Sequence, residues 1–243
     1  MRRPVPIACS TCWVRARAEW SGLDRSEVAL LDRAHRPRVY MPGETIFCQG
    51  DESQGLYCVE SGHILLRQFD VFGNETAFRL IVPGDTMGGR SFFAEQPHAA
   101  TARVLTSCRV CLIPSATVRR LLERNPALGL RFLRTLARDR GPSEAPLLRS
   151  PHLPVRMRLV HLLLVLKDSC AAPSTDGELV LELPLSRSDI AAMVGARAET
   201  VTRTIRDLQD EGVARFCGRQ VIVPKLDRLL DIVGKDASTS STR

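Results

Sequence analysis

Hydrophobic and polar residues alternate with the two-residue period of β-strands through the middle of the chain. From Arg38 to Ile113 the alternating runs are short, and glycines interrupt them about every ten residues, at Gly43, Gly50, Gly62, Gly73 and Gly84. The segments 72–75 (Phe-Gly-Asn-Glu) and 83–85 (Pro-Gly-Asp) have the composition of tight turns. This pattern predicts an antiparallel β-roll or jelly roll.

A helical period flanks the predicted roll on both sides. Residues 23–34 carry apolar positions three and four apart, which predicts a short helix. After Pro114 the same spacing returns in 118–122 and 128–136. These two segments predict one or two amphipathic helices.

The segment after these helices is rich in residues that stop a helix. Gly141 is followed by prolines at positions 142, 146, 151 and 154. Because a proline inside a helix costs about 3 kcal/mol or more, one straight helix cannot run through this region. We therefore expect a connecting helix that is shortened or kinked and ends near Gly141.

The C-terminal third contains two short amphipathic helical patterns within residues 186–211. Gly195 separates them and can adopt the positive φ that a sharp turn between helices requires. Ser186 and Asp189, three positions apart, have the pattern of a capping box at the start of the first helix. Two apolar runs around a Cys-Gly-Arg centre in 213–225 predict a hairpin. Helix, turn, helix and hairpin in succession indicate a winged helix.

The second helix of this pair presents a polar face. Its apolar residues leave Glu199, Thr202 and Arg203 together on the opposite side, because these positions are three and four apart. A carboxylate, a hydroxyl with a methyl group, and a guanidinium can recognise base edges in the major groove of DNA. Glu199 and Arg203 could instead form a solvated ion pair worth about 0.3–0.5 kcal/mol. The positions of further arginines favour DNA binding, namely Arg197, Arg206 and Arg219.

The charge of the chain permits a polyanionic partner without identifying one. The 243 residues carry a formal net charge of +7, and the pI is near 9.3. Basic and acidic residues are equal in number between 152 and 234, so DNA binding is inferred from where the arginines stand. No apolar run is long enough to span a membrane, and no apolar core of an export signal follows the basic start of the chain. We expect a soluble, cytoplasmic protein with no membrane partner.

These patterns predict an α+β chain of successive parts. A cysteine-bearing segment (1–22) precedes the β-roll domain (23–116). A proline-interrupted connecting region (117–150) then leads to the winged helix-turn-helix domain (151–234). The final residues (235–243) are polar, and we expect a disordered tail there.

Eight cysteines in a chain without an export signal are not expected to form a disulfide framework. Cys9-x-x-Cys12 and Cys108-x-x-Cys111 have the spacing of a four-thiolate metal site. However, the second pair lies in a strand pattern, where residues three apart point to opposite faces. Cys108 and Cys111 therefore cannot easily reach one ion, and we expect one of them to be a packed thiol.

The order of a β-roll, a connecting helix and a winged helix resembles the Crp/Fnr family of bacterial transcription regulators. The resemblance covers nearly the whole chain and depends on two segments, 42–66 (PGETIFCQGDESQGLYCVESGHILL) and 185–212 (LSRSDIAAMVGARAETVTRTIRDLQDEG). It implies a sensor domain of the cyclic-nucleotide-binding type and a homodimer paired through the connecting helix. It also implies a two-fold symmetric promoter site, with half-sites about one helical turn apart, and RNA polymerase as a partner.

The cyclic-AMP-binding branch of this family carries a carboxylate for the ribose and an Arg-Ser pair for the cyclic phosphate. The corresponding positions here hold Gly89 and Ala99-Ala100, so a buried phosphate would lack its charge partner. Arg90 could serve as a substitute anion ligand, although an exposed loop arginine is the simpler interpretation. Cyclic AMP is therefore not the expected ligand.

The Fnr-like branch is the better match in the winged helix. Its Glu-x-x-Ser-Arg pattern is similar to Glu199, Thr202 and Arg203. By this analogy Arg203 would donate to a guanine, Glu199 would accept from a cytosine amine, and Thr202 would touch a thymine methyl. Arg197, near the start of the helix, would contact a phosphate.

The Fnr-like branch holds an iron-sulfur cluster through three N-terminal cysteines and one cysteine at the end of the roll. Cys9 and Cys12 resemble the first two ligands, and Cys111 resembles the last. Ala18 or Trp20 stands where the third N-terminal cysteine is expected. A cluster needs ligands on all sides, so the resemblance leaves the fourth ligand open.

Other cysteines offer alternatives. Cys48, Cys58 or an external ligand could complete a cluster, or the cluster could be lost and the thiols be relic or redox-reactive. Cys217, in the predicted hairpin, could be oxidised and block the approach of DNA, or be a small packed residue.

Two further possibilities concern histidines. A histidine of the roll, His63 or His98, could ligate haem iron, although lone histidines are more often ordinary surface residues. A metal-dependent enzyme built on a jelly roll would need several histidines and carboxylates on its strands, and only these two histidines lie between Arg38 and Ile113. We predict a DNA-binding transcription regulator that responds to oxygen or redox state, and not an enzyme.

Overall fold

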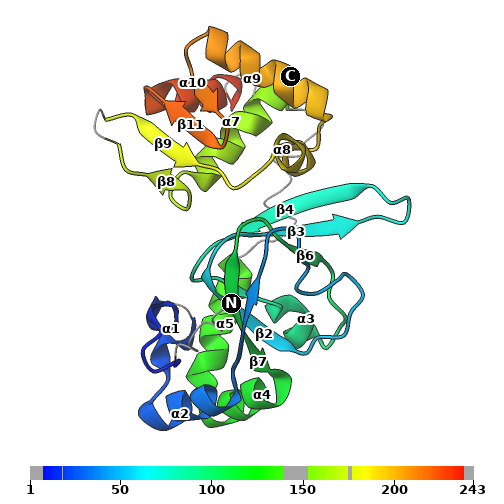
Figure 1. The fold of residues 1–243 in the computed structure, drawn as a ribbon, viewed down its shortest axis with the longest axis vertical. Helices are drawn as coiled ribbons and strands as arrows, with labels where there is room; N and C mark the ends of the chain where they lie inside the picture. The colour runs from blue at the N-terminus through cyan, green and yellow to red at the C-terminus, as the bar shows by residue number, and fades with distance from the viewer. Residues whose placement is uncertain (1–7, 18, 139–152, 175–176, 238–243) are drawn as a thin grey trace. The chain divides into compact units, whose positions relative to one another are not determined.

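The computed structural model describes residues 8–17, 19–138, 153–174 and 177–237, which form two compact units (Figure 1). The N-terminal unit contains two β-sheets and the helices that flank them. One sheet has the strand order β1-β7-β2-β5 and the other β4-β3-β6. The strands are β1 Arg36–Tyr40, β2 Gly55–Ser61, β3 Ile64–Phe69, β4 Glu75–Ile81, β5 Thr86–Met87, β6 Thr101–Val104 and β7 Cys108–Pro114. The helical segments are α1 Trp13–Arg17, η1 Glu19–Gly22, α2 Arg25–Ala34, α3 Gly89–Ala94, α4 Ser115–Arg124 and α5 Pro126–Arg138.

Strand β2 lies inside the larger sheet because both of its faces are apolar. Side chains of a strand point alternately to opposite faces. Leu56 and Cys58 accordingly pack into a core formed with the helices, whereas Tyr57 and Val59 pack into the interior of the roll. All four residues are buried. One strand therefore belongs to two hydrophobic cores.

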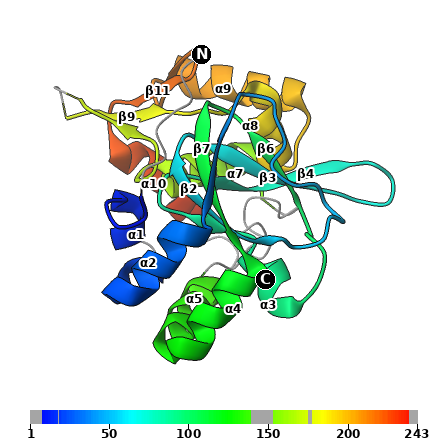
Figure 2. The ribbon, with the colours of Figure 1, turned by 60° about the horizontal axis from the view of Figure 1, so that its bottom comes forward.

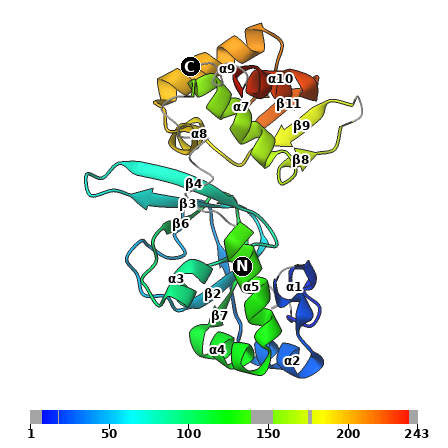
Figure 3. The same cartoon turned by 180° about the vertical axis from the view of Figure 1, so that it is seen from behind.

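The helical segments at the two ends of this unit pack against each other beside the larger sheet. Trp20 of η1 is 1% exposed, and its ring meets Phe132 of α5 edge to face with 5.0 Å between centroids. Figure 3 shows α1, η1 and α2 beside α5. Helix α2 starts with a capping box, in which the Asp24 carboxylate accepts from Glu27 N and Asp24 N donates to the Glu27 carboxylate.

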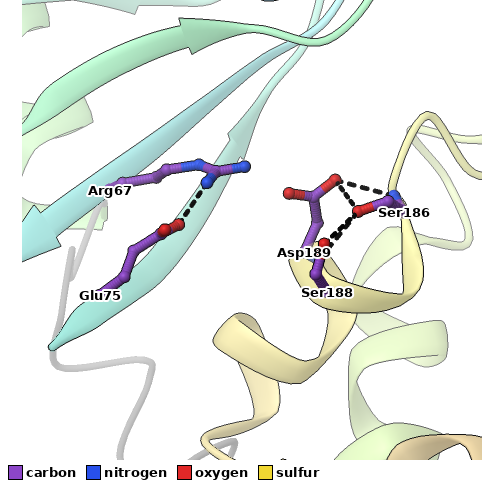
Figure 4. A network of polar contacts seen from close by, with 5 residues as sticks. All are labelled: Arg67, Glu75, Ser186, Ser188 and Asp189. Carbon is purple, nitrogen blue, oxygen red and sulfur yellow. Dashed lines mark hydrogen bonds and ion pairs between the residues drawn. The ribbon is translucent and has the colours of Figure 1, made fainter. Parts of the chain in front are cut away.

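Strands β2 and β3 are joined by a turn that only glycine can form. Gly62 has a φ of +83°, and a Cβ atom there would lie 2.4 Å from the carbonyl oxygen of Ser107. Strand β3 then pairs with β4 in a hairpin that projects from the roll (Figure 2). Arg67 of β3 and Glu75 of β4 form an ion pair within this hairpin (Figure 4).

The C-terminal unit is a small helical domain with a four-stranded sheet. Its strand order is β10-β11-β9-β8, and the three strand pairs are antiparallel. The helices are α7 Val155–Leu166, α8 Arg187–Val194, α9 Ala198–Asp210 and α10 Leu226–Ala237. The strands are β8 Ala171–Ala172, β9 Leu179–Glu182, β10 Arg215–Cys217 and β11 Gln220–Val223.

The predicted architecture is confirmed, with one correction at the C-terminus. The β-roll, the two helices after Pro114, the helix-turn-helix and the β10–β11 hairpin all form as the periodicity indicates. The expected disordered tail from 235 is wrong for its first three residues, because they belong to α10. Residues 238–243 lie outside the described residues, and so do the prolines at 142, 146 and 151. Helix α5 extends to Arg138, and the predicted helix end near Gly141 and the exact domain limits stay predictions.

Candidate nucleic-acid interface and cysteine cluster

Helix α9 has one buried face and one exposed face. Val201, Ile205 and Leu208 are at most 3% exposed and fix the helix to the domain core. Glu199 and Arg203 are exposed on the other side, and Thr202 between them is partly exposed. The three side chains predicted to share a polar face therefore do so. The surrounding arginines predicted from the sequence are exposed as well, at Arg197, Arg206 and Arg219.

The side chains of Glu199 and Arg203 do not bind each other. Within the described residues neither side chain forms an ion pair or a hydrogen bond, so the solvated ion pair considered above is not formed. Thr202 behaves differently, because its hydroxyl donates to the carbonyl oxygen of Ala198 at 2.9 Å. The hydroxyl hydrogen is thus used inside the helix, which leaves the methyl group and the oxygen lone pairs for an outside contact. Sequence spacing alone did not indicate this bond.

Hydrogen bonds stabilise both ends of helix α8. Ser186 and Asp189 form the predicted capping box, in which Ser186 Oγ accepts from Asp189 N and Ser186 N donates to the carboxylate of Asp189 (Figure 4). Gly195 ends α8 with a φ of +62°, as the turn prediction required. At the same end, Nη1 of Arg158 donates to the carbonyl oxygens of Val194 at 2.6 Å and Gly195 at 3.1 Å.

Arg158 is an anchor of the helix-turn-helix that the sequence analysis missed. It stands on α7, is 9% exposed, and burial lowers the pKa of its guanidinium. Helix ends carry unpaired carbonyl groups, and a cation there satisfies them and favours the helix dipole. In the sequence, the only indication of this role is an arginine inside a leucine-rich helical segment.

The hairpin β10–β11 packs next to the start of α8. The guanidinium of Arg187 lies over the ring of Phe216, 5.0 Å from its centroid, and Phe216 N donates to the side-chain oxygen of Gln209 on α9. These contacts connect the hairpin to both helices of the helix-turn-helix. The exposed Arg219 in the hairpin turn is thereby carried by the same rigid domain as Arg203.

Four cysteines form a cluster at one face of the larger sheet of the roll. We call Cys9, Cys12, Cys58 and Cys111 the cysteine cluster. The pKa of Cys9 is raised to about 12, mainly by burial and also by the nearby Asp32, Cys111 and Cys12. Burial likewise raises the pKa of Cys111 to about 12, with Glu60 and Cys12 as further causes. These mutual effects show that the three predicted ligands lie near one another.

Cys58 is the fourth member of the cluster. It lies directly opposite Cys111 in the antiparallel pair of β2 and β7, which places both side chains on one face of the sheet. Burial raises the pKa of Cys58 well above its ordinary value, with Cys111, Glu19 and Cys9 as minor causes that raise it. Its sulfur lies 3.9 Å from Oγ1 of Thr86. Of the two cysteines considered as a fourth ligand, Cys58 therefore lies at the cluster, whereas Cys48 is exposed in the loop before β2.

The prediction that Cys108 and Cys111 face opposite ways is confirmed. Cys108 packs into the interior of the roll and donates to the carbonyl oxygens of Thr106 at 3.0 Å and His63 at 3.3 Å. Cys111 packs against the core formed by the helices. Cys108 is therefore the packed thiol of the pair. Cys217 is exposed in β10, so it is not the packed residue considered for the hairpin.

Two polar residues of α2 and its end lie beside Cys9. A carboxylate oxygen of Asp32, a ring nitrogen of His35 and the sulfur of Cys9 all lie within 4.8 Å of one another. Asp32 accepts hydrogen bonds from the backbone N–H groups of Cys9 and, at 3.3 Å, Ser10. These residues carry no sequence motif, and only the fold brings them to the cysteine.

The positions tied to cyclic-nucleotide binding lie around α3. Gly89 is the first residue of α3, Ala99 is exposed, and Ala100 is buried. Next to them His98 is 3% exposed and stacks on Phe47, with ring centroids 3.9 Å apart. Burial lowers the pKa of His98, so the ring is neutral near pH 7.

His63 lies in the turn between β2 and β3, and its backbone N–H donates to Thr106 Oγ1 at 2.9 Å. Haem ligation by His63 or His98 stays a prediction. In the described part of the chain, no helix is both long and apolar enough to cross a lipid bilayer.

Known proteins resemble the chain in both units. A model of the cyclic nucleotide-binding domain matches residues 37–125, and a model of the Crp-like helix-turn-helix domain matches residues 157–232. The chain is 27% identical over 235 residues to the transcriptional activator protein FnrL of Cereibacter sphaeroides, which covers 94% of this chain and 93% of FnrL. It is 26% identical over 210 residues to a CRP-like cAMP-activated global transcriptional regulator of Mycobacterium tuberculosis, covering 86% and 93% of the two chains.

A solved structure shares the fold. FixK2 from Bradyrhizobium japonicum superimposes with a TM-score of 0.73 and 21% sequence identity, covering 82% of this chain and 97% of FixK2. The match therefore includes most of both chains and shows a shared fold.

Proposed function

The chain belongs to the Crp/Fnr family of DNA-binding transcription regulators, and from this premise we propose that α9 recognises base sequence and that the cysteine cluster makes the regulator respond to redox state. The observation that carries the first part is the exposed, unpaired state of Glu199 and Arg203 on a helix whose other face is buried. A side chain that is not engaged within the protein is available to a duplex.

The three polar residues that share the exposed face of α9 have distinct roles, which follow from their chemistry. Arg203 donates two hydrogen bonds to a guanine, and Glu199 accepts from a cytosine amine. Thr202 offers its methyl group to a thymine, which agrees with a hydroxyl that is already bonded to Ala198. The remaining exposed arginines contact phosphates and set the register of the helix on the duplex, namely Arg197, Arg206 and Arg219.

Selection from a random pool of duplexes tests this assignment. The full chain should enrich one two-fold symmetric sequence with half-sites about one helical turn apart. Arg203→Ala should lower affinity for that sequence by about 1–3 kcal/mol and leave affinity for scrambled DNA nearly unchanged. Arg206→Ala should weaken binding to both duplexes and reduce the salt dependence of binding. Arg103→Ala, an exposed arginine of β6, is the control and should change neither. Equal losses on both duplexes for Arg203→Ala refute its role.

The proposed regulator is a homodimer that acts with RNA polymerase at promoters, as the family implies. Helix α5 supports pairing, because Leu130 and Leu133 are 56% and 61% exposed on it. Sedimentation of the full chain at micromolar concentration should show a dimer, and Leu133→Lys should shift it toward monomer. A wild-type protein that sediments as a monomer, and binds the two-fold site no more tightly than a single half-site, contradicts this part of the proposal.

The redox response is proposed from the cysteine cluster. Cys9, Cys58 and Cys111 pack at one core, and Cys12 acts on the pKa of both Cys9 and Cys111, so oxidation there changes how the N-terminal segment is held to the roll. Such a change shifts the population of DNA-binding conformers only if it favours one of them. DNA affinity should therefore fall or rise when diamide replaces dithiothreitol, and Cys12→Ser should abolish that difference. Cys48→Ser is the control, because this thiol is exposed outside the cluster.

An iron-sulfur cluster, which the Fnr-like resemblance implies, does not fit the residues as they stand. Trp20 occupies one position where a third N-terminal cysteine was considered, and it is buried against Phe132. Replacing that ligand with Cys58 would require a sulfur that is enclosed in the core beside Thr86. Absorbance near 400 nm after anaerobic purification tests this directly.

Cyclic AMP is not proposed as the signal, although the cyclic nucleotide-binding model matches the roll. The positions that would bind the ribose and the phosphate hold Gly89, Ala99 and Ala100, which offer no charged group. Calorimetric titration with cyclic AMP should give no binding heat at micromolar ligand, and submicromolar binding overturns the expectation. No catalytic role is proposed for any residue.

A further inference from the structure

Three metal-ligating side chains of different chemistry converge where the N-terminal segment meets the end of α2. The sulfur of Cys9, a carboxylate oxygen of Asp32 and a ring nitrogen of His35 lie within 4.8 Å of one another. Cys9 is buried, and the other two residues are partly buried. Asp32 lies in the last turn of α2 and His35 caps its C-terminal end, whereas Cys9 comes from a distant part of the sequence.

The imidazole of His35 is held through its Nδ1 atom. Its Nδ1 lies 3.1 Å from the carbonyl oxygens of both Leu31 and Asp32, so Nδ1 carries the hydrogen and donates. This tautomer leaves a lone pair on Nε2. Metal-bound histidines characteristically donate their other ring N–H in this way, which fixes the ring and makes the ligating nitrogen more basic.

The ligating nitrogen lacks any partner in the described part of the chain. Nε2 of His35 is buried and accepts no hydrogen bond there. A buried polar atom without a partner is unfavourable, and native proteins leave few of them. A cation held at this nitrogen would remove the deficit and would also neutralise the nearby carboxylate.

Asp32 is held in place with coordination capacity to spare. Its Oδ1 accepts from the backbone N–H groups of Cys9 and Ser10, which ties the N-terminal segment to α2. Its Oδ2 has no hydrogen bond among the described residues and can bind an ion. The same carboxylate thus positions the cysteine and offers a ligand beside it.

The distances suit one ion. Bonds from Zn²⁺ to sulfur, nitrogen and oxygen are about 2.0–2.3 Å, so ligand atoms of a tetrahedral site lie roughly 3.3–3.7 Å apart. The three donors lie within 4.8 Å of one another, so small side-chain movements bring them to that spacing. Mixed thiolate, imidazole and carboxylate ligation suits Zn²⁺ or Fe²⁺ more than Mg²⁺ or Ca²⁺, which prefer oxygen alone.

We propose that Cys9, Asp32 and His35 form a site for a single divalent transition-metal ion such as Zn²⁺, with one coordination position left to solvent. The ion joins the N-terminal segment to α2 beside Cys58 and Cys111. On binding, the Cys9 thiol loses its proton to solvent and the thiolate becomes a ligand. The site does not depend on the assignment of α9, so either proposal can fail alone.

Zinc binding to the full chain tests the site. The protein is first stripped with a chelator and then titrated with Zn²⁺ in competition with a chromogenic chelator. We expect one zinc per chain, and a rise in melting temperature on zinc addition, because an ion that binds only the folded state stabilises it. Co²⁺ in place of Zn²⁺ should give the visible bands of a tetrahedral ion and a thiolate charge-transfer band.

Matched variants identify the ligands. His35→Gln and Cys9→Ser should each weaken zinc binding at least tenfold and abolish the zinc-dependent rise in melting temperature. Cys12→Ser, the other thiol of the same C-x-x-C segment, should leave both unchanged. Melting of the zinc-free variants shows whether they fold; if Cys9→Ser does not, His35→Gln decides.

Three results overturn the proposal. One is the absence of zinc binding to folded wild-type protein at micromolar zinc. Another is a loss in Cys12→Ser as large as in Cys9→Ser, which would assign the ion to a thiolate pair. The third is iron with an equal amount of sulfide in protein purified without oxygen, which would assign the cysteines to a cluster.

Discussion

Removing the Arg158 guanidinium should loosen the helix-turn-helix, and Arg158→Met is the cleanest perturbation. Methionine keeps an unbranched apolar stem but removes Nη1, which donates to both Val194 and Gly195. Each hydrogen bond from a charged donor contributes about 1.5–3 kcal/mol, and relief of the buried charge offsets part of the loss. We expect a net destabilisation of about 2–4 kcal/mol, confined to the C-terminal unit.

Arg156→Met is a matched control two positions away on the same helix. Arg156 forms an ion pair with Glu211, but the side chains are 33% and 48% exposed. A pair that is open to solvent contributes about 0–1 kcal/mol, so this variant should change stability little.

Hydrogen exchange in the full chain measures the effect where it should occur. Peptides from 186–211 should exchange faster in Arg158→Met by a factor that corresponds to about 2–4 kcal/mol, and peptides from β2 and β7 should be unchanged. Because the chain has two units, a single global melting temperature would not separate these effects. Equal exchange in the two variants, or a loss below about 0.5 kcal/mol for Arg158→Met, refutes the anchoring role.

Two further predictions concern the roll and its thiols. Gly62→Ala should destabilise the protein by well over the roughly 1–2 kcal/mol that left-handed backbone costs, because the added Cβ would collide with a carbonyl oxygen. Gly73→Ala should cost only the backbone strain, because nothing lies within 4 Å of its added Cβ. Urea unfolding compares the two variants, and equal losses of stability contradict the steric account. Burial raises the pKa of Cys108 and of Cys170 to about 11, so the folded protein keeps these two protons at a pH where the unfolded chain loses them. Their contribution to stability is therefore present below the pKa of the unfolded chain and is lost as the pH rises toward 11. At pH 8 iodoacetamide should modify the exposed thiols of Cys48 and Cys217 rapidly, and the buried thiols of Cys108 and Cys170 only after unfolding. Peptide mapping measures the labelling, and rapid labelling of the two buried thiols in the folded protein contradicts their burial.

Local periodicity was sufficient for the winged helix and the roll. The face of α9 followed from the spacing of Val201, Ile205 and Leu208, because a helix that buries one stripe must expose the other. The split between Cys108 and Cys111 followed from the two-residue period of a strand.

Contacts between distant segments were beyond local patterns. The approach of Cys58 to Cys111 depends on the register of β2 on β7, and that of Asp32 to Cys9 depends on how the N-terminal segment folds back on α2. Arg158 reaches the end of α8 only in the folded domain. Helix α10 was not predicted, although the apolar spacing of residues 226–233 that is typical of a helix is present after the hairpin.

A thermodynamic cycle between Arg203 and one guanine tests the central claim most directly. The guanine identified by selection is replaced with 7-deazaguanine, which lacks the N7 acceptor, and affinities of wild type and Arg203→Ala are measured on both duplexes. If the guanidinium of Arg203 binds that base edge, the substitution weakens wild-type binding by about 1 kcal/mol or more and has almost no effect on the variant. Equal losses in both proteins would contradict base recognition by Arg203.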